Sequence, residues 1–183
     1  RYFEQLVVGR TPDEVLDIVA RICGICPVAY QMSAVHAFED LAGIAIEPSV
    51  RALRRLLYCG EWIESHALHL YLLHAPDFLG VANAVELAAL DRVAVERGLA
   101  LKKAGNRIVS VLGGRPIHPV SVRVGGFSKV PTKHELQVLR PELAAALRHA
   151  IRTVDWVATF EAPHSVRDER FVSMRHPTEY PMS

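Results

Sequence analysis

Two cysteines at a C-x-x-C spacing are the side chains with the clearest capacity for chemistry in this sequence. Cys23 and Cys26 enclose Gly24, which lets the backbone turn tightly, and Pro27 follows and stiffens the exit. Two thiolates at this spacing can bind one soft or borderline metal ion, and the metal keeps both sulfurs ionised. Arg21 would add positive charge close to the pair. We therefore expect the two sulfurs to point into one cavity, within about 4 Å of each other.

The spacing alone leaves three other interpretations of these cysteines open. A zinc ribbon needs a second pair of ligands, and the sequence has no second C-x-x-C, since Cys59 stands alone. A thioredoxin-like redox pair favours a βαβ context, whereas the flanking pattern predicts helix, turn and helix. Two buried structural thiols are the third possibility. The cysteines themselves do not separate metal ligation from these alternatives.

The composition excludes several classes of protein. Half of the 183 residues are hydrophobic and 22% are charged, which suffices for a buried core and argues against disorder. The 21 Lys and Arg residues balance 20 Asp and Glu residues, so a general polyanion binder is disfavoured and no nucleic-acid partner is expected. No stretch approaches the roughly 18 unbroken apolar residues of a membrane helix, so no membrane span is expected. Three cysteines do not make a disulfide scaffold, which favours a cytoplasmic location.

Helix signals dominate the elements that must position the cysteines. Capping boxes at Thr11 and Thr132, each with a glutamate three residues later, mark two helix starts, and Pro27 can begin another helix. The pair Gly105-Asn106 is expected to end a helix, and the segment 75–77 with its proline to stop a long apolar-periodic one. The predicted helices cover residues 11–20, 27–43, 50–74, 83–104 and 132–156.

A turn-rich segment interrupts these helices in the second half of the chain. Residues 113–119 combine glycine, proline and histidine, and residues 120–124 alternate like a short strand. We expect a mainly α fold, a helical bundle with a small β or loop insertion, and a single partial domain over residues 1–183. The sequence starts at Arg1 and the residues after Asp155 carry little periodicity, so it reads as an incomplete piece of a longer protein.

The residues around the cysteine pair resemble a known family. The stretch Arg21–Ala29, which reads RICGICPVA, resembles the first cysteine motif of nickel–iron hydrogenase large (alpha) subunits. Further stretches resemble the same family in the same order, namely Phe3–Glu4, Gly9–Arg10, Ser33–Glu39, Ser65–Tyr71, Pro76–Asp77 and Gly113–Pro119. The stretch Cys26–Ala34 is most similar to the soluble, NAD(P)-coupled branch that includes the sulfhydrogenases. The resemblance covers most of residues 1–130.

This resemblance implies a role for individual residues. Cys23 would be a terminal nickel ligand, and Cys26 would bridge nickel and an iron that also carries carbon monoxide and cyanide. Glu4 would hold magnesium or a similar hard cation, which prefers oxygen ligands. Arg21 would lie beside the catalytic metals. His118 would face a small subunit, whose nearest iron–sulfur cluster takes the electrons.

The sequence departs from the family pattern at two positions. Tyr30 occupies a position, expected to border the cofactor, at which the usual motif has a histidine. A phenol cannot be protonated to a cation as an imidazole can. Ser65 stands where many membrane-bound relatives have an aspartate, so one charge is removed above the centre. The family's second cysteine pair, near its C-terminus, has no counterpart here. The sequence thus supplies half of a metal site on the N-terminal half of a large subunit, so the fragment alone should be inactive.

These features lead to a first functional hypothesis, that the chain is part of the catalytic subunit of a nickel–iron hydrogenase. The resemblance implies reversible heterolytic cleavage of H2, with electrons passed through an iron–sulfur small subunit, then through diaphorase subunits, towards NAD(P). The second hypothesis is a non-catalytic structural or proton-coupling protein related to the quinone-site subunit of respiratory complex I. That protein shares the fold without the metal ligands, so retention of Cys23 and Cys26 argues against it. A stand-alone metal or redox dithiol module is disfavoured by the missing partner ligands.

Three other groups of side chains have structural interpretations. His66 and His69 lie three residues apart on one helix face and are expected to be packing histidines, because no Asp, Glu or Cys converges on them. Cys59 is expected to be a buried free thiol. The arginines of the segment 51–55 are expected to form a solvated helix face.

Overall fold

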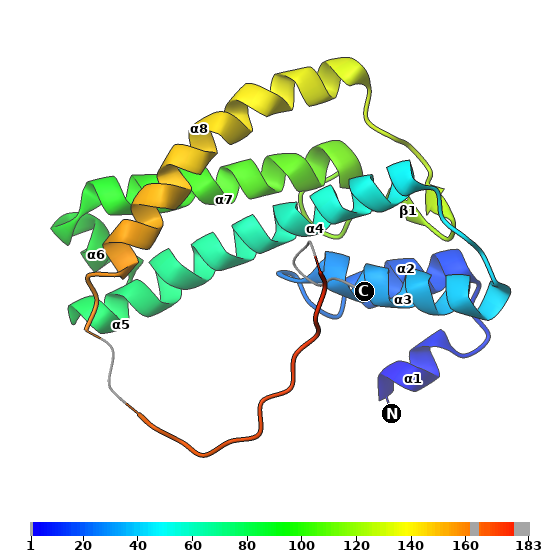
Figure 1. The fold of residues 1–183 in the computed structure, drawn as a ribbon, viewed down its shortest axis with the longest axis horizontal. Coiled ribbons are helices and arrows are strands. Elements are labelled where there is room, and N and C mark those ends of the chain that lie inside the picture. Colours follow the sequence, from blue (N-terminus) through cyan, green and yellow to red (C-terminus); the bar gives the residue numbers. More distant parts are fainter. Residues whose placement is uncertain (1, 162–164, 178–183) are drawn as a thin grey trace.

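Helices make up most of the structure (Figure 1). The computed structural model describes residues 2–161 and 165–177. In chain order its elements are α1 (Tyr2–Val7), α2 (Pro12–Ala20), α3 (Pro27–Ala42), α4 (Pro48–Leu68), the π-helical η1 (His69–His74), α5 (Ala75–Leu79), α6 (Ala84–Leu90), α7 (Arg92–Gly113), β1 (Val122–Arg123), β2 (Gly126–Phe127) and α8 (Lys133–Val157). The prediction of a mainly α fold with a small β insertion is confirmed, since β1 and β2 pair antiparallel.

Local capping sets the ends of several helices as the sequence predicts. At α2 the Thr11 hydroxyl accepts the backbone N–H of Glu14, whose carboxylate accepts the N–H of Thr11 at 2.8 Å. Thr132 and Glu135 repeat this capping box at the start of α8. Gly43 ends α3 in the left-handed conformation, with φ of 63°, which glycine adopts at little steric cost. These helix ends are therefore confirmed.

The close packing of α4 against α7 corrects one prediction. Gly105 and Asn106 do not end a helix, because α7 continues through them to Gly113. Gly105 is buried against α4, and a Cβ there would lie 2.6 Å from the carbonyl oxygen of Gly60 and 2.5 Å from the amide nitrogen of Glu64. The glycine serves the close approach of two backbones, which a pattern within one helix does not reveal.

The predicted helix over residues 83–104 is instead two helices. α6 ends at Leu90 and α7 begins at Arg92. Between them, the Asp91 side chain accepts the backbone N–H of Ala94 at 2.8 Å. A short acidic side chain in this position caps a new helix, and the single-helix prediction is wrong for that reason.

The helix predicted over residues 50–74 continues beyond its predicted end. α4 passes at Leu68 into the π-helical turn η1, and η1 passes directly into α5. Pro76 lies at the start of α5, which directly follows the π-helical turn η1, so the residue without an N–H lies where the hydrogen-bond pattern of the helix is already irregular. The proline therefore does not stop the helical course, which ends before Gly80.

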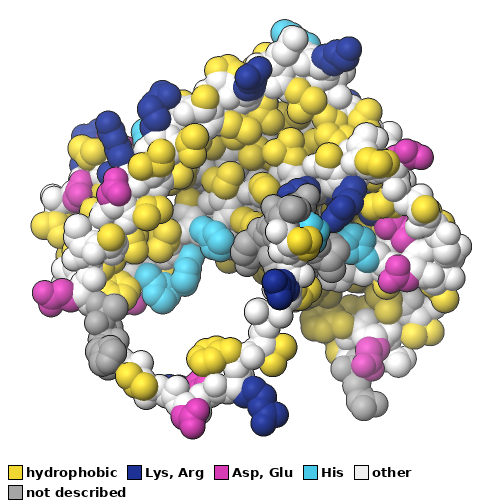
Figure 2. Space-filling model, in the orientation of Figure 1, with side chains coloured by type: hydrophobic (Ala, Val, Ile, Leu, Met, Phe, Trp, Pro, Cys, Tyr) yellow, Lys and Arg dark blue, Asp and Glu magenta, His cyan; other side chains and the backbone are white. Residues whose placement is uncertain are grey.

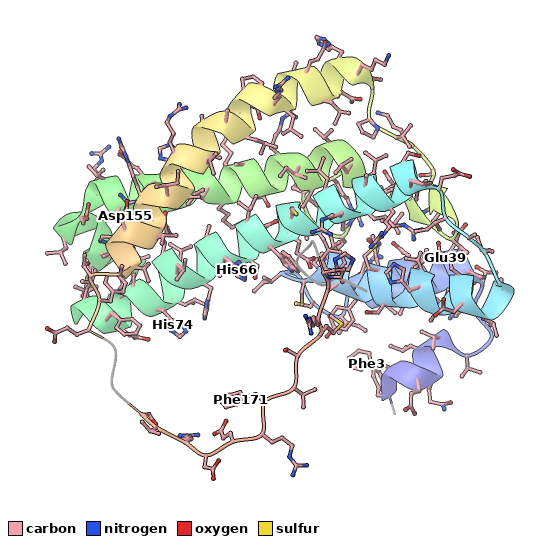
Figure 3. All side chains as sticks on the ribbon, in the orientation of Figure 1. Phe3, Glu39, His66, His74, Asp155 and Phe171 are labelled. Atoms are coloured by element: carbon pink, nitrogen blue, oxygen red, sulfur yellow. The ribbon has the colours of Figure 1, made fainter. Side chains whose placement is uncertain are left out.

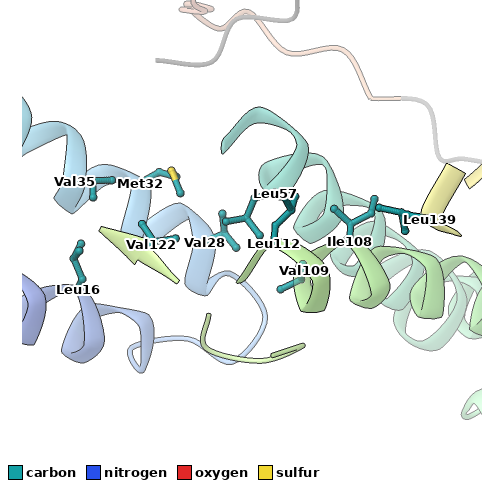
Figure 4. Packing of buried hydrophobic residues seen from close by; sticks show 10 residues of the cluster. All are labelled: Leu16, Val28, Met32, Val35, Leu57, Ile108, Val109, Leu112, Val122 and Leu139. Atoms are coloured by element: carbon teal, nitrogen blue, oxygen red, sulfur yellow. The ribbon is translucent and has the colours of Figure 1, made fainter. Parts of the chain in front are cut away.

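Two groups of buried side chains hold the helices together. The first joins α2, α3, α4, α7, α8 and β1 (Figure 4), and its members are Leu16, Val28, Met32, Val35, Leu57, Ile108, Val109, Leu112, Val122 and Leu139. The second joins α8 to η1 and α7, and in it the ring of Tyr71 stacks on Trp156 with 5.0 Å between centroids. Full burial of each large apolar side chain is worth about 1.5–3 kcal/mol.

A buried ion pair holds the β insertion and corrects the prediction of a solvated arginine face. Arg54 is 3% exposed and donates two hydrogen bonds to Glu39, at 2.6 and 2.8 Å. Glu39 also accepts the backbone N–H of Gly125 at 2.7 Å, and Arg54 donates to the carbonyl of Arg123 at 3.1 Å. Arg51 is exposed, as predicted. Arg54 is buried because the β insertion folds over it.

An apolar cavity of about 640 Å³ lies between α4, α7 and α8, and hydrophobic side chains gather in the hollow beneath α8 (Figure 2). Cys59 lines this cavity and is half-buried, where the sequence predicted a buried thiol. His66 and His74 project from the open side of α4 and η1 (Figure 3). His66 and His69 are exposed, so the prediction that they are packing histidines is wrong.

The segment 165–177 follows an extended course outside the helices (Figure 1). Apolar side chains along it, such as Phe171, lie in solvent (Figure 3). Across residues 2–161 and 165–177, no helix combines the length and the apolar character that a membrane crossing requires.

Candidate metal centre

The two cysteines lie in the turn that joins α2 to α3. α2 ends at Ala20, and the backbone N–H groups of Arg21 and Ile22 still bond to carbonyls of its last turn. Cys26 directly precedes α3, and Pro27 is the first helical residue. Proline suits this position because its φ is already helical and its missing N–H would have no helical partner. The chain therefore presents both thiols at a junction between two helices.

The Cys23 sulfur is the better prepared of the two to carry negative charge. It accepts the backbone N–H groups of Ile25 (3.4 Å) and Cys26 (3.3 Å). Stabilisation of its thiolate by the neighbouring Cys26 thiol is the main cause that lowers the pKa of Cys23, and these two N–H groups add to it. Burial is the main cause that raises the pKa of Cys26 to about 11. Both thiols are free and half-buried, so a ligand can reach them.

A buried carboxylate from α4 supports the same junction. Glu61 is 3% exposed, and its Oε2 and Oε1 accept the backbone N–H groups of Val28 (2.6 Å) and Ala29 (3.2 Å) in the first turn of α3. Burial raises the pKa of Glu61 to about 7, against the opposing effect of these hydrogen bonds. The sequence prediction missed Glu61. The signal for it was its place four residues after Leu57 on the buried face of α4, where a charged side chain needs a partner.

The loop that carries His118 also contacts this junction. His118 Nδ1 donates to the carbonyl oxygen of Ala20 at 2.7 Å, and Gln31 Nε2 donates to the carbonyl of Pro119 at 2.7 Å. His118 has a left-handed φ of 51°, and Arg115 Nε donates to its carbonyl at 2.5 Å. A non-glycine residue in this conformation is strained by about 1–3 kcal/mol and persists because its contacts hold it. The structure thus brings His118 next to the residues that lead into the cysteine pair.

Three other predicted site residues take no part in these hydrogen bonds. Arg21 is exposed and forms an ion pair with Asp17 on α2. Tyr30 lies on α3 and is 37% exposed. Glu4 is exposed on α1 and makes no hydrogen bond or ion pair to any residue in the described ranges. Their roles at a cofactor or a cation stay predictions.

The donor set fits part of a metal centre. Two free thiols in one turn can each lose a proton and bind a soft metal through sulfur. Within the part of the chain that the structure describes, no three His, Cys, Asp or Glu side chains converge to hold a metal. A closed tetrahedral site needs four ligands, and Cys23 and Cys26 can supply two of them. Further ligands would have to join these two thiols.

Comparison with known proteins finds relatives for this chain. The family model described as nickel-dependent hydrogenase matches residues 1–98. The alpha chain of sulfhydrogenase 2 from Pyrococcus furiosus is 40% identical over 166 residues, which are 91% of this chain and 40% of that protein. An F420-non-reducing hydrogenase of the vhu type from Methanocaldococcus jannaschii is 37% identical over 86% of this chain and 39% of that protein. The chain therefore spans about two fifths of the length of these curated relatives.

Solved structures agree with the sequence comparison. An NAD+-reducing NiFe hydrogenase in the H2-reduced state matches with a TM-score of 0.82 at 31% identity, over 86% of this chain and 37% of that chain. The Ni-Fe-Se hydrogenase from Desulfomicrobium baculatum matches with a TM-score of 0.71 at 25% identity, over 84% of this chain and 36% of that chain. The helices of this chain have the arrangement of the corresponding part of these proteins.

Proposed function

Because this chain belongs to the nickel-dependent hydrogenase family, we propose that it forms the N-terminal part of the catalytic large subunit of a nickel–iron hydrogenase. The resemblance of the motif around Cys23 to this family is thereby confirmed. The proposed activity is the reversible heterolytic cleavage of H2. The observation that carries the proposal is the pair of free, half-buried thiols of Cys23 and Cys26 at the α2–α3 junction of a chain of this family.

In this proposal Cys23 and Cys26 would be two of the sulfur ligands of the nickel–iron centre, and Cys26 would take the bridging role that the resemblance implies. When bound, the centre supplies soft, redox-active metals that polarise H2. The chain itself orients the sulfurs and holds a proton. Cys23, as a terminal ligand, holds that proton at its Sγ, and the N–H groups of Ile25 and Cys26 orient this atom.

Further parts of the proposed enzyme rest on the family resemblance. The iron would carry carbon monoxide and cyanide, Glu4 would hold magnesium or a similar hard cation, and Arg21 and Tyr30 would border the centre. His118 would lie towards a small subunit whose iron–sulfur clusters pass electrons to diaphorase subunits and NAD(P). The similarity to an NAD+-reducing enzyme supports this acceptor. Free cysteines among the described residues favour a reducing, cytoplasmic location.

Elemental analysis of the full-length gene product, purified without oxygen from its native host, tests the proposal. We expect nickel and iron together, with H2-dependent reduction of a viologen dye and of NAD(P)+. Cys23→Ser and Cys26→Ser should each remove nickel and activity, because a hard oxygen donor replaces a soft thiolate. Cys59→Ser, at the half-buried thiol in the apolar cavity, is the control and should keep both.

Zinc alone, or no metal at all, in the wild-type protein would contradict the proposed function. Reduction of the dye without reduction of NAD(P)+ would contradict the acceptor and leave the hydrogenase assignment intact. Nickel retained at the wild-type level in Cys26→Ser would contradict the bridging role of that sulfur.

A further inference from the structure

We infer that Glu61 is a positioning residue of the metal centre, because it caps α3 from α4 and thereby fixes Cys26 at the start of that helix. The identity of the metals rests on the proposed function. The contacts that carry the inference belong to this chain and do not depend on which metal is bound.

Glu61 accepts hydrogen bonds from two backbone N–H groups at the start of α3 that have no acceptor in the helix or the cysteine turn. The first N–H groups of an α-helix have no acceptor within the helix. In α3, Pro27 has no N–H and the N–H of Tyr30 bonds to the carbonyl of Cys26, so the N–H groups of residues 28–29 need an acceptor. The side chain before the helix usually supplies one, but Cys26 makes no such bond. Both N–H groups bond instead to the carboxylate of Glu61.

This arrangement frees the Cys26 sulfur for another partner. A side chain that capped α3 locally would turn towards the backbone N–H groups of the helix and away from a metal. Glu61 performs the capping from 33 residues away in sequence, and its two oxygens accept N–H groups that have no acceptor within the helix. The Cys26 thiol is therefore free to bind a metal beside Cys23, whose sulfur accepts the backbone N–H of Cys26 at 3.3 Å.

The surroundings of Glu61 make it a rigid support. Its neighbour Gly60 lies where the backbone of α4 closely approaches Gly105 of α7, and Leu57, one turn earlier, belongs to the same buried group as Val28. Because Glu61 is 3% exposed, water has little access to replace its oxygens. Loss of the carboxylate would leave two buried N–H groups without an acceptor and would draw the Cys26 sulfur or the whole turn towards them.

Hydrogen exchange in the metal-free, full-length protein tests the contact, with Glu64 as the matched control. Glu64 lies on the same helix, is also buried, and bonds to Lys102 and not to α3. In Glu61→Ala the amides of residues 28–29 should exchange at least about tenfold faster, since hydrogen bonds to a charged acceptor are lost. Glu61→Gln keeps one acceptor oxygen, so its exchange rate at these amides should lie between those of the wild type and Glu61→Ala. Glu64→Gln should match the wild type at these amides.

Nickel content and the nickel electron paramagnetic resonance spectrum of the matured protein separate positioning from a general loss of stability. Glu61→Ala should hold less nickel than Glu64→Gln, and the spectrum of its loaded fraction should shift because the Cys26 sulfur has moved. If Glu61→Ala does not fold, Glu61→Gln is expected to show the same changes in smaller measure. Wild-type nickel content and spectrum in the Glu61 variants would overturn the inference. If the wild type holds no nickel, the proposed function fails, and unchanged exchange at residues 28–29 would still overturn the role of Glu61.

Discussion

The imidazole Nδ1 of His118 lies 2.7 Å from the carbonyl oxygen of Ala20, at the last residue of α2. A carbonyl can only accept, so Nδ1 carries the proton of this bond. The contact joins residues that are 98 apart in sequence and ties the glycine-rich loop to the helix that leads into the cysteine pair. Together with the bond from Gln31 on α3 to Pro119 in this loop and the bonds of α3 to Glu61, it ties the cysteine turn to the glycine-rich loop and to α4.

His118→Ala should lower the free energy of unfolding by about 1–2 kcal/mol, because the bond to Ala20 is lost and alanine tolerates a positive φ poorly. His118→Asn should lose less, since asparagine offers a donor and adopts the left-handed conformation more readily. Urea unfolding of the full-length protein measures both. Equal losses in the two variants would contradict this account of His118.

Gly105→Ala should lower the free energy of unfolding by about 3 kcal/mol, although alanine has the higher helix propensity. The new Cβ would meet backbone atoms of Gly60 and Glu64 at 2.6 and 2.5 Å, and backbone cannot move aside as a side chain can. Lys103→Ala, at an exposed position of the same helix, is the control and should change stability little. A Gly105→Ala protein as stable as the wild type would show that α4 and α7 do not pack this closely.

Glu39→Gln should lower the free energy of unfolding by about 3 kcal/mol, because the buried Arg54 would lose its counter-charge. Burial raises the pKa of Glu39, but the hydrogen bonds from Arg54 and Gly125 and the charge of Arg54 outweigh it, so the net pKa lies below 4.5. As the pH falls, the unfolded chain binds the proton first. Ionised Glu39 therefore stabilises the protein fully above about pH 4.5, and this stabilisation is lost as the pH falls through the pKa of Glu39 in the folded protein.

Urea unfolding at a series of acidic pH values measures this loss, which should be steeper in the wild type than in Glu39→Gln. Asp40→Asn, at an exposed neighbour on α3, should follow the wild type. The same acid dependence in Glu39→Gln as in the wild type would exclude Glu39 as its source.

Glu61 should make the metal-free protein less stable as the pH rises. Burial holds its pKa at about 7 in the folded protein, compared with 4.5 as the ordinary value. Between pH 4.5 and about 7, Glu61 has lost its proton in the unfolded chain but keeps it in the folded protein. The free energy of unfolding should therefore fall by up to about 3 kcal/mol as the pH rises through this range. Glu61→Gln should lack this slope, as measured by chemical denaturation over that pH range. Glu64→Gln should retain most of it, because burial is the main cause of the raised pKa and the charge of Glu64 a smaller one. An identical slope in Glu61→Gln would assign the pH dependence to other groups.

Glu4→Gln should affect stability only where a hard cation is bound. Glu4 is exposed and has no partner within the described residues, so the substitution should cost less than about 0.5 kcal/mol in chelator-treated protein. In the full-length protein with magnesium, loss of the carboxylate charge should weaken the binding of the ion and lower the melting temperature further. Glu47→Gln, at another exposed glutamate, is the control. A chelator effect of equal size in wild type and Glu4→Gln would rule out Glu4 as the ligand.

Local sequence patterns sufficed to predict the features that depend on neighbouring residues. The capping boxes at Thr11 and Thr132 join residues three apart, so their hydrogen bonds form as soon as the helix starts and can be read directly. The pair Cys23 and Cys26 is equally local, and the motif around it sufficed to identify the family. Where a local signal was ambiguous, as at Gly105, the prediction failed.

The tertiary structure decided what surrounds the cysteines. Glu61 reaches the N–H of Val28 across 33 residues, and His118 reaches Ala20 across 98. Gly105 became a contact between α4 and α7 instead of a helix end, and Arg54 became buried under the β insertion. The physical reason is the same in each case. The position of a glycine or a charged residue in a helical pattern is the same whether it faces solvent or another helix. Only the packing of elements that are distant in sequence provides its contact partner, and that partner decides its structural role.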